Sequence, residues 1–404
     1  MVVYFSFLFH IYQPPVQIAP VIKRIVKESY LPMINALHEH PHAKISLNIN
    51  ATLTEQLNDY GFADIIEGLS TLASRGQIDF TGSGKFHPLL PLMPDQEIFR
   101  QIKLNNETNR QYFGESYNPR GFFPPELAIS EELFPIIQEM GFDWVICSGI
   151  ANSLVEFPTR WISQHEKTGL NLLFRDDYIS VDCAFDKLNN VENFVNRLKY
   201  KNQDHDYYVI LALDAETFGH HVKHAINDFL IPLYKALPHR NDIKMCTISE
   251  IIERFPKGPK QTPKASSWST MPYDLEQNIP FPLWFDPNNP LHREQHKIIM
   301  YSLSAVHLVQ KYYSSMNKEQ KQLFNNARTF LDRGIHSCQQ WWASKRPFYS
   351  PDMILRGLSE IFLSIVNVKR SIPPPPTVYP EITEMIAEIL KEMLKSHNEI
   401  VLSL

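Results

Sequence analysis

The chain has 404 residues, of which 44% are hydrophobic and 21% are charged, an ordinary balance for a globular protein. This length predicts one large domain with a smaller one, or two domains. The formal net charge of −5, without any cluster of Lys and Arg, argues against a nucleic-acid partner. No hydrophobic run approaches the roughly 18–20 residues that a membrane helix needs, so no membrane partner is expected either.

The cysteines give no sign of a metal or redox motif. Cys147, Cys183, Cys246 and Cys338 lie far apart and form no C-x-x-C pair, so they are expected to be free and mostly buried. The first ten residues, MVVYFSFLFH, are hydrophobic but carry neither a basic leader nor a small-residue cleavage site. We interpret them as a first core strand and expect a cytoplasmic protein.

Short hydrophobic runs alternate with helical patterns over roughly the first 250 residues. The runs predicted as strands are Val2–Phe9, Ile45–Ile49, Ile78–Thr81, Gly121–Phe123, Trp144–Cys147, Ile179–Cys183, Tyr207–Leu213 and Ile243–Cys246. Helices are expected between most of them, for example at Pro20–His38, Asp95–Phe113, Ser130–Met140 and Val191–Lys201. This alternation predicts a parallel sheet that closes into a barrel, with an open doubly wound sheet as the alternative. Because no G-x-G-x-x-G follows the first strand, a dinucleotide-binding fold has no support.

The alternation is expected to stop at Lys257. Residues 257–290 contain seven prolines and the tryptophans Trp268 and Trp284, and they are too hydrophobic for a disordered linker. The later helical patterns are Leu291–Ser314, Lys318–Arg333, Pro351–Val368 and Glu381–Ser396, with a stiff break at Pro373–Pro376. The predicted domains are therefore a catalytic barrel at 1–256, an ordered connection at 257–290 and a C-terminal helical domain at 291–404.

Polar side chains gather where four of the predicted strands end. In a parallel barrel the carboxyl ends of the strands meet at one mouth, where active sites form. The four strand ends read FHIYQPP, TGSGKFHPLLP, GFFPPELAIS and LDAETFGHH, and they supply His10, Gln13, His87, Glu126, Asp214, Glu216 and His220. The predicted strand starts carry nothing comparable. This asymmetry predicts one active site at that mouth.

Each of these residues also has an ordinary structural explanation. Glu126 could be the acidic first turn of the helix expected at Ser130, and Asp214 could be a helix N-cap. His10 and His87 could be hydrogen-bonded core or turn histidines. The paired tryptophans in CQQWWASKRP could belong to a core rather than to a sugar platform. The coincidence of these residues at four strand ends favours a shared site.

The histidines after Asp214 raise the question of a metal. His220 and His224 have the i, i+4 spacing of a shared helix face, but HHVKH lacks the glutamate of an H-E-x-x-H motif. No G-x-S-x-G motif of a serine hydrolase is present. Two carboxylates on different strand ends instead suit the cleavage of a glycosidic bond. One carboxylate attacks or stabilises the anomeric centre, and the other protonates the leaving oxygen.

The four motifs resemble those of glycoside hydrolase family 57, the retaining enzymes that act on α-glucans. FHIYQPP resembles the first motif and GSGKFHPLLP the second. GFFPPELA resembles the third, whose glutamate is the nucleophile, at the position of Glu126. LDAETFGHH resembles the fourth, D-x-E-x-F-G, whose first aspartate is the general acid/base, at the position of Asp214. The resemblance runs from residue 2 to about residue 255 and implies an incomplete (β/α)7 barrel followed by a C-terminal helical bundle.

The resemblance implies a double displacement on an α-glucan or maltooligosaccharide, of the α-amylase or 4-α-glucanotransferase type, without a metal or organic cofactor. The residues expected to bind the substrate or to orient the site are His10, Gln13, His87, Glu216, His220, Trp341 and Trp342. The last two would reach in from the helical domain and stack on sugar rings.

The chain also departs from the family pattern. Tyr12 stands where many members have a second histidine, and Pro124 and Pro125 stand where tryptophan and leucine are common. Gln339 and Gln340 stand near the tryptophans of the fifth motif, where an acidic residue is common. A branching enzyme, an α-galactosidase and a catalytically silent carbohydrate-binding homologue therefore stay open. A metal-dependent deacetylase or mannosidase on a related barrel is disfavoured because FHIYQ lacks an H-x-D pair.

Overall fold

The structure is a computed structural model that describes all residues except 188, 200–203, 347, 373–378 and 404. The described residues form two compact units. The first comprises Met1–Gln13, Gln17–Lys85 and Leu90–Trp268, and the second comprises Pro14–Val16, Phe86–Leu89 and Ser269–Leu404. The break predicted at Pro373–Pro376 lies outside the described residues, as does the end of the helix predicted to reach Lys201.

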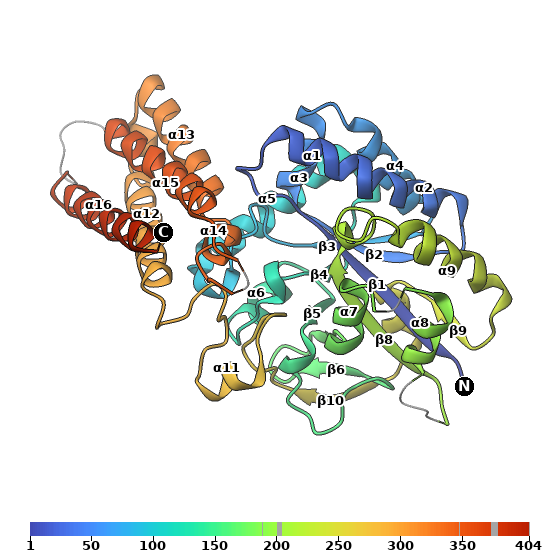
Figure 1. Ribbon diagram of the computed structural model, residues 1–404. Helices are drawn as coiled ribbons and strands as arrows, with labels where there is room; N and C mark the ends of the chain where they lie inside the picture. Colours follow the sequence, from blue (N-terminus) through green and yellow to red (C-terminus); the bar gives the residue numbers. More distant parts are fainter. Residues whose placement is uncertain (188, 200–203, 347, 373–378, 404) are drawn as a thin grey trace. The chain divides into compact units, whose positions relative to one another are not determined.

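The first unit is built on one curled, mostly parallel sheet (Figure 1). Its strands are β1 (Val3–Ile11), β2 (Ile45–Ile49), β3 (Ile78–Gly82), β4 (Gly121–Phe122), β5 (Trp144–Cys147), β6 (Ile162–His165), β7 (Asn171–Phe174), β8 (Tyr207–Asp214), β9 (Ile243–Met245) and β10 (Lys257–Gln261). They lie in the order β10-β6-β7-β5-β4-β3-β2-β1-β8, and β9 also pairs with β1. Within the described residues β6 and β7 pair antiparallel, and the other paired strands run parallel.

Helices connect the parallel strands, as the alternating pattern predicts (Figure 1). They are α1 (Ala19–Ile25), α2 (Leu31–Glu39), α3 (Ala51–Asp59), α4 (Ala63–Ser74), α5 (Asp95–Phe113), α6 (Leu133–Glu139), α7 (Asp177–Ala184), α8 (Val191–Leu198), α9 (Ile231–Ala236) and α10 (Ile248–Arg254). This curled sheet with its connecting helices is the incomplete (β/α)7 barrel that the sequence predicts.

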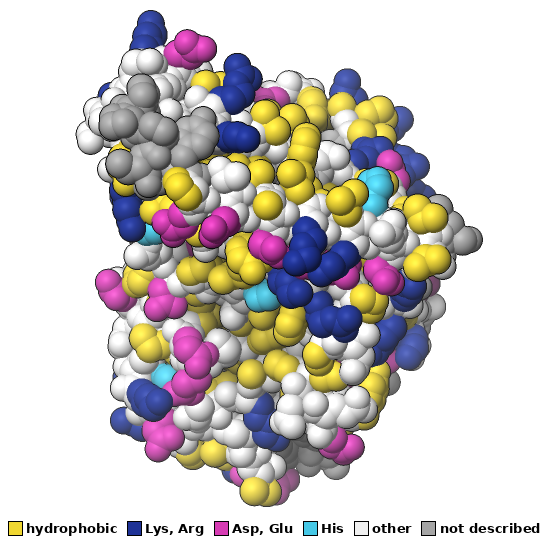
Figure 2. All heavy atoms as spheres, turned by 90° about the vertical axis from the view of Figure 1, so that its left-hand side faces the viewer, with side chains coloured by type: hydrophobic (Ala, Val, Ile, Leu, Met, Phe, Trp, Pro, Cys, Tyr) yellow, Lys and Arg dark blue, Asp and Glu magenta, His cyan; other side chains and the backbone are white. Residues whose placement is uncertain are grey.

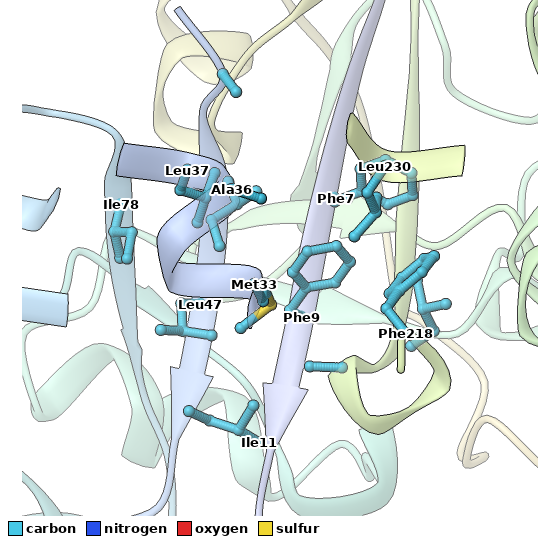
Figure 3. Close-up of a cluster of buried hydrophobic side chains, with 14 of the residues drawn as sticks. Phe7, Phe9, Ile11, Met33, Ala36, Leu37, Leu47, Ile78, Phe218 and Leu230 are labelled. Carbon is cyan, nitrogen blue, oxygen red and sulfur yellow. The ribbon is translucent and has the colours of Figure 1, made fainter. Parts of the chain in front are cut away.

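The first strand separates an outer hydrophobic layer from the inside of the barrel. Its odd-numbered residues pack outward against the helices, and Figure 3 shows Phe9 close to Met33 of α2 and to Phe218, which follows β8. Its even-numbered residues Tyr4 and Leu8 belong to a second, inner cluster. Because side chains alternate along a strand, His10 continues this inner face at the carboxyl end of β1.

The same alternation holds in β8. Tyr208, Ile210 and Ala212 belong to the inner cluster, whereas the odd-numbered residues of the strand pack outward. Asp214 is the last residue of the strand and the next even-numbered position. The period of two therefore brings His10 and Asp214 to the inner face of the barrel at the carboxyl ends of two neighbouring strands.

Three features of this unit differ from the sequence-based predictions. Ile179–Cys183 is not a strand but part of α7, because the side chain of Asp176 accepts a hydrogen bond from the Ile179 N–H at 3.0 Å and so caps a helix. The hairpin of β6 and β7 was not predicted. The strand pattern also does not stop at Lys257, because β10 begins there and pairs with β6.

The second unit contains the predicted C-terminal helices. They are α12 (Pro290–Gln310), α13 (Lys318–Gly334), α15 (Pro351–Ser371) and α16 (Tyr379–Leu402), and the two short helices α11 (Pro272–Glu276) and α14 (Ser337–Trp341) were not predicted. Helix α13 packs along α15, and α12 packs along α16 (Figure 1). Figure 2 shows hydrophobic side chains interspersed with Lys, Arg, Asp and Glu on one face of the molecule. Among the described helices, none is long and hydrophobic enough to cross a membrane.

Candidate active site

Four polar residues lie in one row across the carboxyl ends of four neighbouring strands. His10 of β1 is in register with Asp214 of β8 and with Asn48 of β2, and Asn48 is in register with Thr81 of β3. The Asn48 amide donates to Thr81 Oγ1 at 3.1 Å, so its Oδ1 is free to accept the N–H of His10 Nδ1 at 2.7 Å. These bonds fix the orientation of the His10 ring.

The His10 side chain is suited to accept a hydrogen bond rather than to carry a charge. Burial lowers its pKa to about 4, although the bond to Asn48 acts in the opposite direction. With Nδ1 donating, Nε2 is the acceptor nitrogen of the neutral ring. The ring stacks on Phe123 with centroids 4.8 Å apart and meets Trp268 edge-on at 6.0 Å. Aromatic rings beside one hydrogen-bond acceptor of fixed orientation, the Nε2 of His10, suit the recognition of a sugar hydroxyl.

Asp214 and Glu216 form a pair of carboxyl groups at the end of β8, of which Glu216 is buried and Asp214 is half-buried. Burial raises the pKa of Asp214, and the guanidinium of Arg175 partly offsets this rise. Burial also raises the pKa of Glu216, and the charge of Asp214 raises it further. The two groups interact, so they titrate as a pair and retain a proton to higher pH than ordinary carboxyls. A carboxyl group that is still protonated near neutral pH can act as a general acid.

Glu216 is held by two donors. The side-chain amide of Gln13 donates to Glu216 Oε1 at 3.2 Å, and the hydroxyl of Tyr30 donates to the same oxygen. The amide of Gln17 in turn donates to Gln13 Oε1 at 3.2 Å. Because Oε1 accepts both bonds, a proton on Glu216 belongs on Oε2. Tyr30 is fully buried, and the sequence analysis did not identify it.

Arg175 and Trp268 also belong to this group, and the sequence analysis missed both roles. Arg175 follows β7, where its Nε donates to the Ala212 carbonyl at 2.7 Å and its Nη1 donates to Asp177 Oδ1 at 2.9 Å. Its guanidinium lies 5.9 Å from the centre of the Trp268 ring. The arginine was overlooked because the strand that precedes it was not predicted. The hydrophobic run NLLF directly before Arg175 was the available signal.

Glu126 lies in a short turn after β4. Its φ of 62° and ψ of 17° are left-handed, as is the φ of 48° at Leu127. Non-glycine residues adopt this region at a cost, and such strain is concentrated at functional sites. The Glu126 carbonyl accepts the Trp268 N–H at 3.1 Å, which holds the turn. Helix α6 begins only at Leu133, so Glu126 is not part of its first turn.

The structure also argues against the simple capping explanation for Asp214. Asp214 precedes a single 3-10 turn, Ala215–Thr217, and its side chain makes no capping hydrogen bond to that turn. Capping therefore does not explain the position of this half-buried side chain.

His220 and His224 do not share a helix face. Both lie in turns, and they contact different partners: His220 Nδ1 lies 2.5 Å from Glu28 Oε2, and His224 Nε2 lies 3.1 Å from Asp186 Oδ2. Among the residues that the structure describes, no group of three or more His, Cys, Asp or Glu side chains could hold a metal ion.

Three other predicted site residues belong to the second unit. His87 has a φ of 56°, and its Nδ1 lies 2.9 Å from Ser337 Oγ. The rings of Trp341 and Trp342 meet nearly edge-on with centroids 4.6 Å apart, and Trp341 also contacts Phe348. Both tryptophans are half-buried.

Gln339 and Gln340 are fully buried in the second unit. The Gln339 carbonyl accepts from the Gln295 amide at 3.0 Å, and the Gln340 carbonyl lies 3.0 Å from His292 Nε2. The two glutamines that depart from the fifth motif are therefore built into the interior of this unit.

A groove of about 680 Å³ lies at the other, amino-terminal ends of the strands. Its lining includes Tyr4, Lys44, Lys244, Arg254 and Glu250, and none of the residues of the four motifs. The motif residues of the first unit therefore gather at the opposite mouth of the barrel from this groove.

Comparison with known proteins places the chain in a family. The family model for glycosyl hydrolase family 57 matches residues 7–263, which is more than half of the chain. The chain belongs to glycosyl hydrolase family 57. The resemblance inferred from the motifs is therefore confirmed.

Several proteins of known activity are similar to this family 57 member. Alpha-amylase 1 of Dictyoglomus thermophilum is 33% identical over 144 residues, which are 36% of this chain and 21% of that protein. The structure of the 4-alpha-glucanotransferase of Thermococcus litoralis superposes with a TM-score of 0.73 at 18% identity, covering 92% of this chain and 60% of that one. The branching enzyme of Pyrococcus horikoshii superposes with a TM-score of 0.72 at 15% identity, covering 97% and 96%.

The matched segment spans about a fifth of the Dictyoglomus relative and three-fifths of the glucanotransferase structure. The structural likenesses establish the shared fold, an incomplete barrel with a C-terminal helical region. The activity of this chain is a separate question.

Proposed function

We propose that this family 57 protein is a retaining glycosidase that acts on α-glucans, as an α-amylase or a 4-α-glucanotransferase. The observation that carries the proposal is the half-buried carboxyl group of Asp214, with its raised pKa, in register with the neutral His10 at the carboxyl ends of β8 and β1. Relatives named as an alpha-amylase, a 4-alpha-glucanotransferase and a branching enzyme support an α-glucan substrate.

In the first step the Glu126 carboxylate attacks the anomeric carbon, and the bond from that carbon to the leaving oxygen breaks. Asp214 donates its proton to the leaving oxygen, so the shortened glucan departs as an alcohol. The raised pKa of Asp214 suits this role because the acid must be protonated at the start. The strained backbone at Glu126 supports a functional role for its side chain.

In the second step Asp214, now ionised, takes a proton from water or from a sugar hydroxyl. The oxygen of that molecule attacks the anomeric carbon and releases Glu126. Water as the acceptor gives hydrolysis, and a sugar gives transfer. Two inversions at one carbon retain its configuration. No metal or organic cofactor takes part in this scheme.

His10 and Gln13 are proposed to hold sugar hydroxyls beside the cleaved bond, and Glu216 and His220 to orient the loop that follows Asp214. His87, Trp341 and Trp342 are proposed as further substrate contacts. In this proposal residues 1–256 form the catalytic barrel, 257–290 an ordered connection, and 291–404 a helical domain that contributes the two tryptophans. Cys147, Cys183 and Cys246 are free cysteines in the structure, which supports a reducing, cytoplasmic setting.

The test is to incubate the full chain with maltoheptaose and with amylose and to separate the products by chromatography. Shorter chains alone indicate a hydrolase, and a ladder of longer and shorter chains indicates a 4-α-glucanotransferase. Products that shorten only after treatment with a debranching enzyme indicate a branching enzyme. Glu126→Gln is expected to lose at least about 10³-fold in kcat, and Asp214→Asn about 10²–10⁴-fold.

Glu156→Gln is a matched control because Glu156 is exposed and pairs only with the surface Arg160 in the contacts described. It should keep full activity. An active Glu126→Gln variant would disprove the assignment of the nucleophile. If the wild type changes neither glucan but still binds one of them, the chain is a silent carbohydrate-binding homologue and the proposal fails.

A further inference from the structure

A proline interrupts the helix that follows the first strand. The chain runs from α1 through a π-helical turn, Val26–Tyr30, into α2, whose second residue is Pro32. Pro32 has no N–H, so the carbonyl of Glu28, four residues earlier, cannot receive the usual α-helical hydrogen bond. This accounts for the wider turn at this point, and such turns are frequent at functional sites.

The π-helical turn contacts the start of the loop that follows β8. The hydroxyl of Ser29 donates to the Ala215 carbonyl at 3.1 Å. The hydroxyl of the next residue, Tyr30, donates to Glu216 Oε1. Ser29 and Tyr30 are fully buried, so both hydroxyls are committed to this contact rather than to solvent.

The same turn also holds the far end of that loop. The Glu28 carboxylate pairs with His220 at 2.5 Å and with Lys223 at 2.6 Å. Gly219, with a φ of +96°, lies so close to the Glu28 carbonyl that an added Cβ would overlap the carbonyl oxygen. The loop from Ala215 to Lys223 is therefore bound at both ends by three successive residues, Glu28, Ser29 and Tyr30.

The carboxyl groups of Asp214 and Glu216 compete for a proton, and each has neighbours that favour its ionised form. The charge of Arg175 lowers the pKa of Asp214 and so favours its ionised form. Tyr30 and Gln13 donate to Glu216 and favour the ionised form of that residue. Burial raises the pKa of Asp214 to about 6 and that of Glu216 to about 8, so near neutral pH Glu216 keeps its proton more readily than Asp214.

The other charged and titratable groups near the loop have separate roles. His10, in register with Asp214, is neutral because its pKa is lowered. Glu28, His220 and Lys223 form an ion cluster of their own. The hydroxyl of Tyr30 is thus the donor from the π-helical turn that acts directly on the pair.

We propose that Tyr30 is a positioning residue whose hydroxyl, by donating to Glu216 Oε1, opposes the protonation of Glu216 and so shifts the proton of the carboxyl pair towards Asp214. The inference rests on the proposed function, in which Asp214 is the acid that protonates the leaving oxygen. Tyr30 acts through Glu216 and touches no reacting atom. Ser29 and Glu28 hold the loop so that the hydroxyl meets this oxygen.

The test is the pH dependence of kcat/KM for the full chain and for Tyr30→Phe. Without the hydroxyl, Glu216 retains the proton more strongly and Asp214 loses it at lower pH. The alkaline limb of the profile should therefore move to lower pH by about one unit, while activity on the acid side is largely retained. Ser29→Ala should lower kcat without moving the limb, because the hydroxyl of Ser29 donates to a backbone carbonyl of the loop rather than to a carboxyl group.

Tyr207→Phe is the matched control, since the buried hydroxyl of Tyr207 donates to the Leu198 carbonyl at 2.8 Å and meets no carboxyl group in the contacts described. A limb that stays in place in Tyr30→Phe, or that moves equally in Tyr207→Phe, overturns the proposal. A limb that moves to higher pH overturns it as well.

A second measurement needs no activity. Protein labelled with ¹³C at the aspartate carboxyl carbons is titrated by NMR, and the Asp214 signal is identified by its loss in Asp214→Asn. The signal should titrate at lower pH in Tyr30→Phe than in the wild type, and an unchanged midpoint refutes the role of Tyr30. If the wild type acts on no glucan, the proposed function fails, and this titration still decides where the proton lies.

Discussion

His10 and Asp214 face each other in register on the adjacent parallel strands β1 and β8. The strand pairing itself sets their spacing, because both lie at the same level of the ladder and on the inner face of the barrel. His10 is neutral and bonded to Asn48, whereas the positive charge of Arg175 lowers the pKa of Asp214. This division between a neutral hydrogen-bonding residue and a charged one leads to separate predictions for the two residues.

The buried His10 should make the stability of the fold depend on pH. Its pKa falls from 6.5 to about 4 on folding, so the unfolded chain binds the proton more tightly than the folded one. The stabilisation is fully present above pH 6.5 and is lost as the pH falls towards 4, a change of about 3 kcal/mol in the free energy of unfolding. Urea unfolding at pH 7.5 and at pH 4 measures it.

His10→Gln should remove this contribution, so the loss of stability between the two pH values becomes smaller by about 3 kcal/mol than in the wild type. His224→Gln replaces an exposed histidine and serves as the control. Equal acid sensitivity of wild type and His10→Gln would contradict the lowered pKa.

Removing the charge of Arg175 should move the activity profile in the direction opposite to the loss of the Tyr30 hydroxyl. Arg175 lowers the pKa of Asp214, so in Arg175→Met the acid retains its proton to higher pH. The alkaline limb of kcat/KM should move up by about one unit. The variant also loses bonds to Ala212 and Asp177, so the position of the limb, rather than the absolute rate, is the measure.

Arg328→Met provides the comparison, because Arg328 forms a partly buried ion pair with Asp332 in the second unit. It should leave the limb in place. If the limb of Arg175→Met stays in place or moves down, Arg175 does not act on the general acid.

Gly219→Ala should destabilise the loop after β8 by more than the cost of placing alanine at a positive φ. The new Cβ would overlap the Glu28 carbonyl, in addition to the cost of a φ of +96°. We expect a loss of about 2–3 kcal/mol in unfolding free energy and at least about tenfold in kcat, since the loop carries Glu216. Denaturant unfolding and steady-state kinetics give the two values.

Gly76→Ala separates the two causes. Gly76 has a φ of +72° but open space where its Cβ would lie, so it bears the backbone cost of about 1 kcal/mol without the overlap. Similar losses in both variants would show that the contact with Glu28 contributes nothing.

The outline of the barrel could be predicted from the sequence because it depends on local patterns. The alternation of strands and helices gave a parallel sheet, and the period of two along β1 and β8 explains why His10 and Asp214 lie inside. Where local patterns were ambiguous the prediction failed: Ile179–Cys183 has the composition of a strand, but the cap at Asp176 makes it a helix. The strand β10 was missed because its residues, KGPKQ, are polar and exposed for most of their length.

The sequence by itself determined which residues stand at the strand ends, their order along the chain and the family to which they belong. Only the tertiary structure decided which side chains surround the carboxyl pair. Arg175, Trp268 and Tyr30 come from a hairpin, a connection and a helical turn that no periodic pattern relates to Asp214. Their effects on charge and orientation act through space over a few ångströms, whereas a sequence pattern reports only the neighbours along one strand or helix. The proline after Tyr30 was visible from the start, but its consequence appears only where the chain folds back against the loop after β8.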